Sequence, residues 1–385
     1  MNGVRERAVA AGFAAGAGAV RVCAAGGDAP TAERFAASVA RGDLATWPYD
    51  RAYAAKAADP QALLAGARSV VCVAVPYAAA GAPRLGPLRG RVSNYAWAAD
   101  YHPVVKRVLR AIAGVLDEAA GAGATKIVCD TAPLAERAFA ARAGLGWAGK
   151  HTTLIAPGLG SYVFLGEVIT TVALEPDVPL RKQCGSCRRC VDVCPTGALR
   201  GDYTIDATRC ISDLTQRRDA IPLALRPLLG DWVWGCDLCQ EACPPTLRAR
   251  APALDPAFAA AGMAAGFDLQ GLLTLGAATF ERRFKRTSLG WRGAAVLRRN
   301  AAVALGNALD RSAVPALIRA LREDPSPLVR GHAAWALGRI GSPPAISALS
   351  QALATEQAYD VREEACRALE PFPSGEALGA RRTSK

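Results

Sequence analysis

Residues 184–197 read CGSCRRCVDVCPTG and contain four cysteines in the spacing C-x2-C-x2-C-x3-C, with a proline directly after the last one. A second run, GCDLCQEACPP at 235–245, adds C-x2-C-x3-C-P, and Cys210 lies between the two runs. Eight thiolates are enough for two cubane clusters with four ligands each. The pattern predicts a ferredoxin-like domain with two 4Fe–4S clusters over residues 176–253.

The spacing also predicts how the ligands divide. In such runs the three closely spaced cysteines bind one cluster, and the cysteine before the proline binds the other. The predicted sets are Cys184, Cys187, Cys190 and Cys243 for one cluster, and Cys194, Cys210, Cys236 and Cys239 for the other. Structural zinc also takes four thiolates and is the competing interpretation, although zinc does not need the C-x2-C-x2-C-x3-C-P run. The isolated cysteines are expected to be small buried hydrophobic residues: Cys23, Cys72, Cys129 and Cys366.

Bulk composition sets the surroundings of these motifs. A chain of 385 residues is long enough for two or three domains. Lys and Arg outnumber Asp and Glu by 46 to 34, which favours a polyanionic partner such as nucleic acid about as much as a basic surface without a partner. Free metal-binding thiols indicate a reducing cytoplasm. Glu6 and Arg21 interrupt the N-terminal apolar segment, so we expect no signal peptide, and we expect no membrane span.

The first 175 residues alternate strand and helix patterns, which predicts an α/β domain over 1–175. Apolar runs at 69–76, 126–130 and 162–170 read as strands, and 101–121 has apolar residues at helical spacing. A further helix is expected to start with Thr131 as its cap, to carry Pro133 in its first turn and to end at Gly144.

Residues 254–385 predict an all-α domain. The segments LRRNAAVAL at 297–305, VRGHAAWAL at 329–337 and VREEACRAL at 361–369 recur with an offset of 32 residues and resemble HEAT-like repeats, which must stack to bury their faces. The same offset joins three arginines, and ion pairs with acidic residues of neighbouring repeats are as reasonable for them as ligand binding: Arg298, Arg330 and Arg362.

Clusters carry electrons but need a separate reaction centre. GLGWAG at 144–149 has the G-x-G-x-x-G form, but it follows a helix rather than a strand, so we do not expect a dinucleotide site. Asp130 ends an apolar strand just before the expected helix, a position where α/β sheets bind ligands and where an ordinary cap also sits.

The order of these motifs resembles one known family. The segments that carry the likeness, besides both cysteine runs and the repeats, are GARSVV at 66–71, YAWAADYH at 95–102, the Asp130 segment, GSYVFLGEV at 160–168 and CIS at 210–212. In this order and spacing the chain resembles the epoxyqueuosine reductases, cobalamin-dependent iron–sulfur enzymes that complete queuosine in tRNA. It departs from the family at Pro245, where tryptophan is usual, and at His151, where asparagine is usual.

The resemblance implies a reaction and a site. The clusters would reduce a cobalamin, and epoxyqueuosine at the wobble position of tRNA would become queuosine. Asp130 matches the family's general acid, and we expect its setting against Val128, Cys129 and Ala132 to keep the carboxyl protonated by desolvation. The positions that match the corrinoid lining are Leu154, Leu165, Ser212 and Asp237. No histidine is expected below the cobalt, and His102 is expected to be structural or a polar pocket group.

The implied partners are a tRNA anticodon arm and a low-potential electron donor, and we expect a monomer. The predicted tRNA contacts are Arg217, Arg218, Arg298 and Arg299, with further candidates at Arg282, Arg283, Lys285, Arg286 and Arg292. Two alternatives stay open from sequence. One is a corrinoid enzyme like a reductive dehalogenase, and the other is a ferredoxin-type electron carrier fused to a HEAT-repeat scaffold without catalysis.

Overall fold

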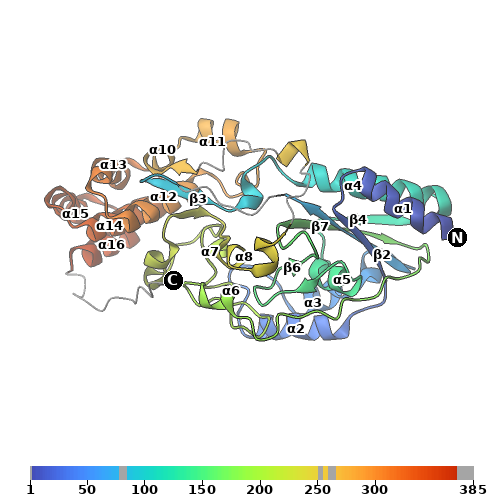
Figure 1. Cartoon of the computed structure of the whole chain (residues 1–385). Coiled ribbons are helices and arrows are strands. Elements are labelled where there is room, and N and C mark those ends of the chain that lie inside the picture. The colour runs from blue at the N-terminus through green and yellow to red at the C-terminus, as the bar shows by residue number, and fades with distance from the viewer. Residues whose placement is uncertain (1, 78–84, 250–254, 259–265, 371–385) are drawn as a thin grey trace.

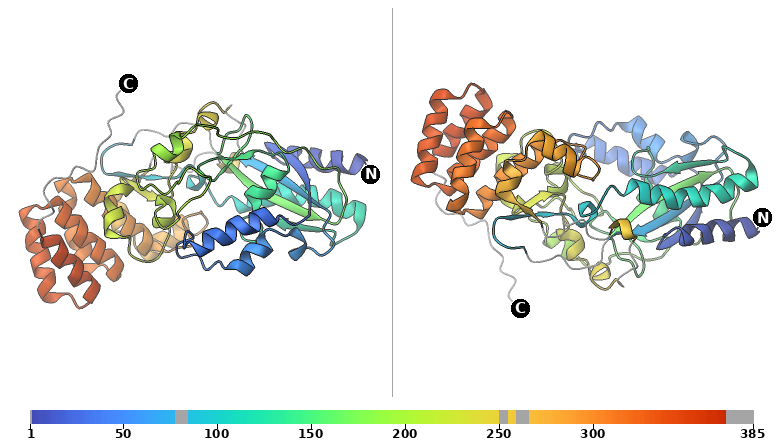
Figure 2. Two further views of the ribbon diagram at one scale, coloured as in Figure 1. Left: turned by 90° about the horizontal axis from the view of Figure 1, so that it is seen from below. Right: turned by 90° about the horizontal axis from the view of Figure 1, so that it is seen from above.

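The computed structural model describes residues 2–77, 85–249, 255–258 and 266–370. The N-terminal sheet with its helices forms one end of the molecule, and the helical repeats form the other (Figure 1). The segment that carries the eight closely grouped cysteines lies between these ends. The two perpendicular views keep the same order of parts (Figure 2).

A four-stranded sheet organises the N-terminal part. Its strands are β1 (Ala19–Ala24), β2 (Ser69–Pro76), β7 (Val163–Thr170) and β4 (Thr125–Val128), in the order β1-β2-β7-β4. The three strands predicted from sequence are confirmed. Every pairing in this sheet is antiparallel. The alternation of strands and helices therefore does not produce a parallel sheet, and the ligand rule for parallel sheets does not explain the place of Asp130.

Helices cover both faces of the sheet. On one face α4 (His102–Ala120) packs beside α1 (Asn2–Ala14) and buries Val105, Leu109 and Ile112 against the odd-numbered valines of β2. On the other face α5 (Glu136–Arg142) packs against the even-numbered residues of β2, and α2 (Ala29–Ala40) and α3 (Arg51–Ala57) lie on the same side in Figure 1. This arrangement explains why β2 is buried along its whole length.

The start of α5 differs from the prediction. Asp130 has a positive φ of 59°, which turns the chain away from the strand before a helix can form. Thr131 does not cap a helix, because its N–H and hydroxyl both donate to the carbonyl of Cys129. The helix begins only at Glu136 and ends just before Gly144, as expected. Gly144 has a φ of 75°, and a Cβ there would lie 2.4 Å from the carbonyl oxygen of Val178.

Short elements connect the sheet to the cysteine segment. The helices are α6 (Arg189–Asp192), α7 (Ile211–Leu214), α8 (Leu238–Glu241) and α9 (Pro244–Leu247), with a β5–β6 hairpin (Trp147–Ala148, Leu154–Ile155) beside them. The 3-10 helices are η1 (Pro60–Ala62), η2 (Asn94–Ala96), η3 (Leu223–Leu229), η4 (Pro256–Phe258) and η6 (Arg311–Ala313).

A small sheet joins regions that sequence places in different domains. β3 (Arg89–Val92) pairs in parallel with β8 (Trp232–Trp234) and antiparallel with β9 (Phe267–Asp268). One strand thus comes from each of the three predicted regions. The division after residue 175 stays a prediction, and the predicted boundary between 253 and 254 lies outside the described residues.

The C-terminal region is a stack of helices, as the repeats predict. It contains α10 (Leu269–Leu273), α11 (Ala277–Phe284), α12 (Ala294–Ala308), α13 (Val314–Glu323), α14 (Pro327–Ile340), α15 (Pro343–Thr355) and α16 (Tyr359–Leu369). The three recurring segments lie in α12, α14 and α16, which pack side by side along the stack. The strand β9 is a small exception to the all-α prediction for this region.

Within the parts of the chain that the structure describes, none of the helices combines the length and the apolar character needed to cross a membrane.

Candidate functional site

The first predicted set of cysteines comes together in space. Burial, together with the thiols of Cys184 and Cys243, raises the pKa of Cys190 to about 11. The pKa of Cys243 is raised by burial first and then by Cys184 and Cys187. Cys243 thus lies with the cysteines of the first run, although 53 residues separate it from Cys190 in the sequence. The structure places the four residues of this set near one another.

The second set is grouped in the same way. The pKa of Cys236 is raised well above its ordinary value by burial, and then by Cys210 and Cys194. The pKa of Cys239 is also raised by burial, then by Cys236 and Cys210, and also by Cys190 of the first set. The two groups therefore adjoin, and α6 packs against α8 beside them. Each group therefore brings together the cysteines that the spacing assigns to one cluster.

The four remaining cysteines divide unequally. Cys23, Cys72 and Cys129 are buried around the sheet, as predicted. Cys366 is exposed on α16, so the prediction for it is wrong. It falls on the outer side of the helix, whereas Val361 and Ala365 face the neighbouring repeat.

Asp130 occupies the turn between β4 and α5. Its side chain is 61% exposed, so the expectation of a desolvated carboxyl is wrong. Its backbone N–H donates to Glu136 Oε1 at 2.7 Å, which holds the turn in place. His102 Nε2 lies 3.8 Å from Asp130 Oδ2, and His102 Nδ1 is 2.7 Å from Asp100 Oδ1. Burial, followed by the charge of Asp130, raises the pKa of Tyr101. Asp130 therefore has a histidine and a phenol beside it.

Two further carboxyl groups lie behind this turn. Glu167 is completely buried in the middle of β7, and burial together with Glu136 raises its pKa well above the ordinary value. The pKa of Glu136 is raised to about 7, chiefly by burial and further by the charge of Asp130, while the N–H of Asp130 acts in the opposite direction. The pair therefore retains protons near neutral pH. Sequence analysis missed both residues, although a glutamate inside the apolar strand VFLGEVIT is a signal that could have found Glu167.

Asp237 forms a second acidic position next to the cysteines. It accepts hydrogen bonds from Ser93 Oγ at 2.6 Å and from the N–H of Asn94 at 2.7 Å. Burial raises its pKa to about 6, against the effect of these donors. Burial first, and then the charges of Asp237 and Asp130, raise the pKa of Tyr95. Tyr95 is thus close to both carboxyl groups, which places the Asp130 turn and the cysteine segment around one group of side chains.

The other predicted corrinoid positions lie in two parts of the chain, the N-terminal part and α7 of the cysteine segment. Leu154 is buried in β6 and Leu165 is half-buried in β7, and both belong to the apolar cluster on the α5 side of the sheet. Ser212 is half-buried in α7, with its Oγ 3.2 Å from Gln216 Nε2. The glycines at 144–149 lead into the β5–β6 hairpin, where a Cβ on Gly146 would lie 2.5 Å from the carbonyl oxygen of Ile155. This close approach accounts for the glycine pattern without a dinucleotide.

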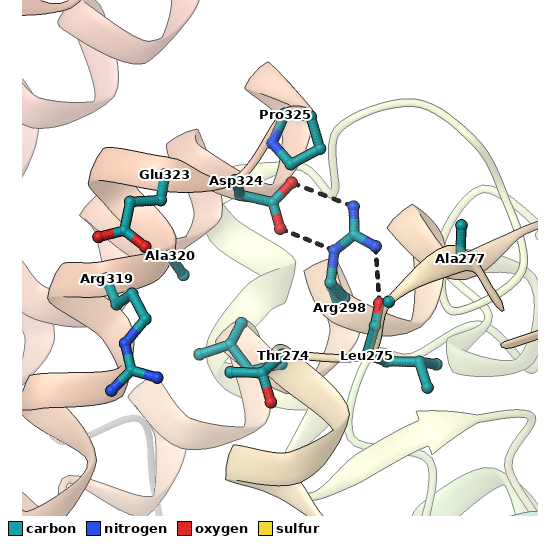
Figure 3. A pocket seen from close by; sticks show the side chains of 11 residues that line it. Thr274, Leu275, Ala277, Arg298, Arg319, Ala320, Glu323, Asp324 and Pro325 are labelled. Carbon is teal, nitrogen blue, oxygen red and sulfur yellow. Dashed lines mark hydrogen bonds and ion pairs between the residues drawn. The ribbon is translucent and has the colours of Figure 1, made fainter. Parts of the chain in front are cut away.

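The repeat arginines are used inside the protein. Arg298 donates to both carboxylate oxygens of Asp324, at 2.7 and 3.1 Å, and to the carbonyl of Leu275 at 2.9 Å, beside the pocket between α10 and α13 (Figure 3). Arg330 pairs with Glu356 one repeat further on. The ion-pair interpretation is therefore confirmed for these two arginines, and Arg362 donates to the carbonyl of Glu356.

Burial also separates the four predicted tRNA contacts. Arg299 is completely buried and donates to the carbonyls of Leu214, Arg217 and Asp219. Arg217 is buried and pairs with Asp213, with Nε 3.0 Å from Oδ2. Together with the paired Arg298, these side chains have no free face for a phosphate, which corrects the prediction for them. Arg218 is exposed, and so are Arg282, Arg283, Lys285 and Arg286.

The fold and the cysteine groups together indicate a class of protein. Two adjoining groups of four cysteines and a helical repeat stack indicate an iron–sulfur protein with a repeat scaffold. Residues 183–246 match the model of a 4Fe-4S double cluster binding domain, and residues 293–370 match HEAT repeats. Residues 58–131 match the model described as epoxyqueuosine reductase QueG, DUF1730.

Relatives and solved structures agree with that match. The chain is 38% identical over 290 residues to an epoxyqueuosine reductase of Bacillus anthracis, covering 72% of this chain and 73% of the relative, and 38% identical over 280 residues to that of Bacillus subtilis, covering 72% of each. A crystal structure of epoxyqueuosine reductase with an epoxyqueuosine-modified tRNA-Tyr stem loop superposes with a TM-score of 0.88 at 34% identity, over 96% of this chain and 98% of that one.

A Bacillus subtilis epoxyqueuosine reductase, solved with its catalytic aspartate loop swung out of the active site, superposes with a TM-score of 0.87 at 32% identity, over 96% of this chain and 98% of that chain. The chain belongs to the epoxyqueuosine reductase family, and it is an oxidoreductase. Membership decides against both alternatives, the dehalogenase-like enzyme and the carrier without catalysis.

Proposed function

We propose that the protein reduces epoxyqueuosine to queuosine in a tRNA anticodon arm, with electrons delivered through two 4Fe–4S clusters and a proton delivered by Asp130. Removal of the epoxide oxygen as water takes two electrons and two protons. The observation that carries the proposal is the placement of Tyr95, which is close both to Asp130 and to Asp237, the residue after Cys236. The hydrogen bonds of Ser93 and Asn94 to Asp237, and the distance of 3.8 Å between His102 Nε2 and Asp130 Oδ2, support a site where electrons and a proton reach the same substrate, because segment 93–102 adjoins both carboxyl groups.

A cobalamin fits the residues between these groups. Of the family positions, the half-buried Leu165 and Ser212 can contact a bound molecule, whereas Leu154 and Asp237 are almost completely buried. Among the described residues, Asn94 Oδ1 and His151 Nε2 are buried without a hydrogen-bond partner, which suits a site whose partner is a bound molecule. When bound, the corrinoid supplies a metal centre that can pass electrons to the epoxide.

The histidines do not supply an obvious ligand for the cobalt. His102 is held by Asp100, and His332 is buried in the repeats between the carbonyl of Leu328 and the N–H of Ile221. His151 has a pKa lowered to about 4, mainly by burial, and its Nδ1 is 2.5 Å from Thr153 Oγ1. We propose that a bound corrinoid would be held by other residues than these three histidines.

The acidic residues divide the handling of protons. Asp130 is exposed and can reach a substrate, so it serves as the proton donor at the departing oxygen. Glu136 holds the turn that carries Asp130, and with Glu167 it forms a store of protons behind the turn. The swung-out aspartate loop of the Bacillus subtilis enzyme supports a turn that has to be held in place.

The tRNA is held by exposed basic residues. A net charge of +12 favours a phosphate backbone, and the exposed Arg218 and Arg286 can contact it, while the exposed Lys285 pairs with Glu281 at 2.8 Å. The carbonyl of Arg286 accepts the N–H of Asp100 at 3.1 Å, so this basic segment adjoins the His102 and Asp130 site. Arg217, Arg298 and Arg299 support the surface from within.

We further propose a cytoplasmic location, because the free thiols require a reducing compartment. The electron donor is then a low-potential carrier, and the protein acts as a monomer.

The test is anaerobic turnover of a stem loop that carries epoxyqueuosine, with queuosine measured by mass spectrometry and iron and cobalt measured in the same sample. Wild-type protein should form queuosine, and Asp130→Asn should retain iron and cobalt while turnover falls about 10²- to 10⁴-fold. Near wild-type turnover by this variant would move the proton donor to another residue. Absence of queuosine from the cofactor-loaded wild-type protein would refute the function itself.

A further inference from the structure

We propose that Trp47, Trp291 and Arg292 form a stacking surface for an unpaired base of the RNA, next in the strand to the nucleotide that reacts. The inference rests on the proposed tRNA substrate and names residues that recognise it. The three residues come from two distant segments, one after α2 and the other between α11 and α12.

The exposed rings are unusual for this protein. Trp47 is 38% exposed and Trp291 is 45% exposed, and their ring centroids lie 5.9 Å apart at an interplanar angle of 26°. The guanidinium of Arg292 lies 3.6 Å from the ring centroid of Trp291 and 5.5 Å from that of Trp47. Exposure of two stacked indoles to water is unfavourable. Together with the planar cation beside them, it indicates a binding surface rather than part of a core.

The rings continue inward as an aromatic ladder, which we define as Trp291, Trp47, Tyr49 and Tyr53. Tyr49 stacks on Trp47 at 6.0 Å and 7°, and Tyr53 stacks on Tyr49 at 4.3 Å and 28°. Burial, together with the charges of Tyr49 and Asp130, raises the pKa of Tyr53 to about 12. Tyr53 lies in α3, and the N–H of Ala135 donates to the carbonyl of Ala57 at the end of this helix at 2.7 Å, so the ladder leads from the exposed indoles toward the Asp130 turn.

The outer rings are held in position before any partner binds. Trp47 Nε1 donates to Asp213 Oδ1 at 3.1 Å, and Asp213 is fixed in turn by the buried Arg217. Arg292 is half-buried, and within the described chain its Nε is buried without a hydrogen-bond partner. The charge of Arg218 lies close enough to lower the pKa of Arg292, after the larger effect of burial. The ordered pair of rings therefore lies next to the Nε–H donor of Arg292, which has no acceptor among the described residues.

These properties favour nucleic acid over protein. The charges of Arg218 and Arg292 repel each other, the carboxylate of Asp213 offsets part of this repulsion, and a phosphate would add a second anion beside the two guanidinium groups. Every base has a flat π-face that stacks on tryptophan and on arginine, so the surface would accept a base without selecting its sequence. A protein partner would need an acidic aromatic surface to match the same features, and the binding experiment separates the two.

The experiment uses the full-length protein and an anticodon stem loop with 2-aminopurine, a fluorescent base, placed on either side of the modified nucleotide. Wild-type protein should quench one of the two labels. Trp291→Ala should abolish that quenching and weaken binding by about 5- to 150-fold, the range for loss of one base–aromatic stack. Trp291→Phe should restore part of the affinity, and Arg292→Ala should weaken binding in the same direction.

Tyr359→Ala is the matched control, because Tyr359 is an aromatic residue with 65% exposure at the start of α16, and its loss should leave binding unchanged. Unaltered thermal unfolding of the Trp291 variants would show that the fold is intact. If wild-type protein binds the stem loop while Trp291→Ala binds it equally well, the stacking surface is refuted and the tRNA substrate stands, and the exposed rings would then suit a protein partner. If wild-type protein binds no stem loop, the substrate proposal fails and this inference fails with it.

Discussion

Glu136 should hold the turn that carries Asp130 in place. Two substitutions separate the effect of its hydrogen bond from the effect of its charge. Glu136→Ala removes the acceptor of the Asp130 N–H, now bound at 2.7 Å. Once the carboxyl of Glu136 is ionised, above its pKa of about 7, this hydrogen bond contributes about 1.5–3 kcal/mol, so the held conformation should then lose about 10- to 150-fold in population. Glu136→Gln keeps a carbonyl oxygen in the same place and should lose only a few-fold, since the neutral acceptor forms a weaker bond.

Because the pKa of Glu136 is about 7, the strength of its hydrogen bond to the Asp130 N–H should depend on pH. As pH rises through this value, the carboxyl ionises and becomes the better acceptor, so the turn should tighten. The folded protein also holds this proton more strongly than the unfolded chain does, with an ordinary value of 4.5. The stability contributed by the protonated carboxyl is therefore fully present below pH 4.5 and is lost as pH rises through about 7.

Hydrogen exchange measures directly how well Glu136 holds the turn. The peptide that spans residues 126–135 is followed by mass spectrometry without substrate. In wild-type protein, exchange corrected for its intrinsic pH dependence should slow as pH rises from 6 to 8. Glu136→Ala should exchange fast throughout, and Glu136→Gln should give an intermediate level that does not change with pH. If Glu136→Ala shows wild-type protection and wild-type turnover, the carboxyl does not hold the turn.

Three further predictions test the cysteine groups, the repeat arginines and the exposed basic residues. Cys210→Ala should lower the iron content of anaerobically reconstituted protein from about eight atoms to about four, and an unchanged iron content and visible spectrum would remove Cys210 from the ligands. Arg298→Ala should destabilise the protein by about 3–5 kcal/mol in denaturant unfolding, because it leaves the buried Asp324 without its partner, whereas Arg319→Ala at the exposed side of the same pocket should have little effect. Stem-loop affinity of folded Arg298→Ala should stay close to wild type, while neutralising Arg218 and Arg286 together should flatten its salt dependence.

Patterns that repeat along the chain predicted structure well. The apolar run of β2, the helical spacing of α4 and the 32-residue offset of α12, α14 and α16 each depend on burial of neighbouring residues, which sequence records locally. The grouping of Cys243 with the first cysteine run followed from the chemistry of cluster ligands. Local pattern and ligand chemistry together were enough for these features.

Properties that depend on distant contacts were predicted poorly. Arg299 looks like a surface cation in the sequence LRRN, yet its helix packs it onto the carbonyls of Leu214 and Asp219. Asp130 follows an apolar strand, but the positive φ of its turn directs the side chain outward. The proton-holding pair of Glu136 and Glu167 exists only because a turn and a strand meet, and neither segment alone indicates the other.

The small sheet of β3, β8 and β9 has a consequence for how the enzyme can change. One apolar core extends from Val92 in β3 through Trp232 in β8 and Phe267 in β9 to the repeat helices as far as Ala368. Regions that share a core unfold together, so the spacing between the repeat helices and the cysteine segment is set when the protein folds. A graft of foreign repeats, or a truncation of these, would disturb the redox centre together with substrate affinity, and selection on either property acts on both.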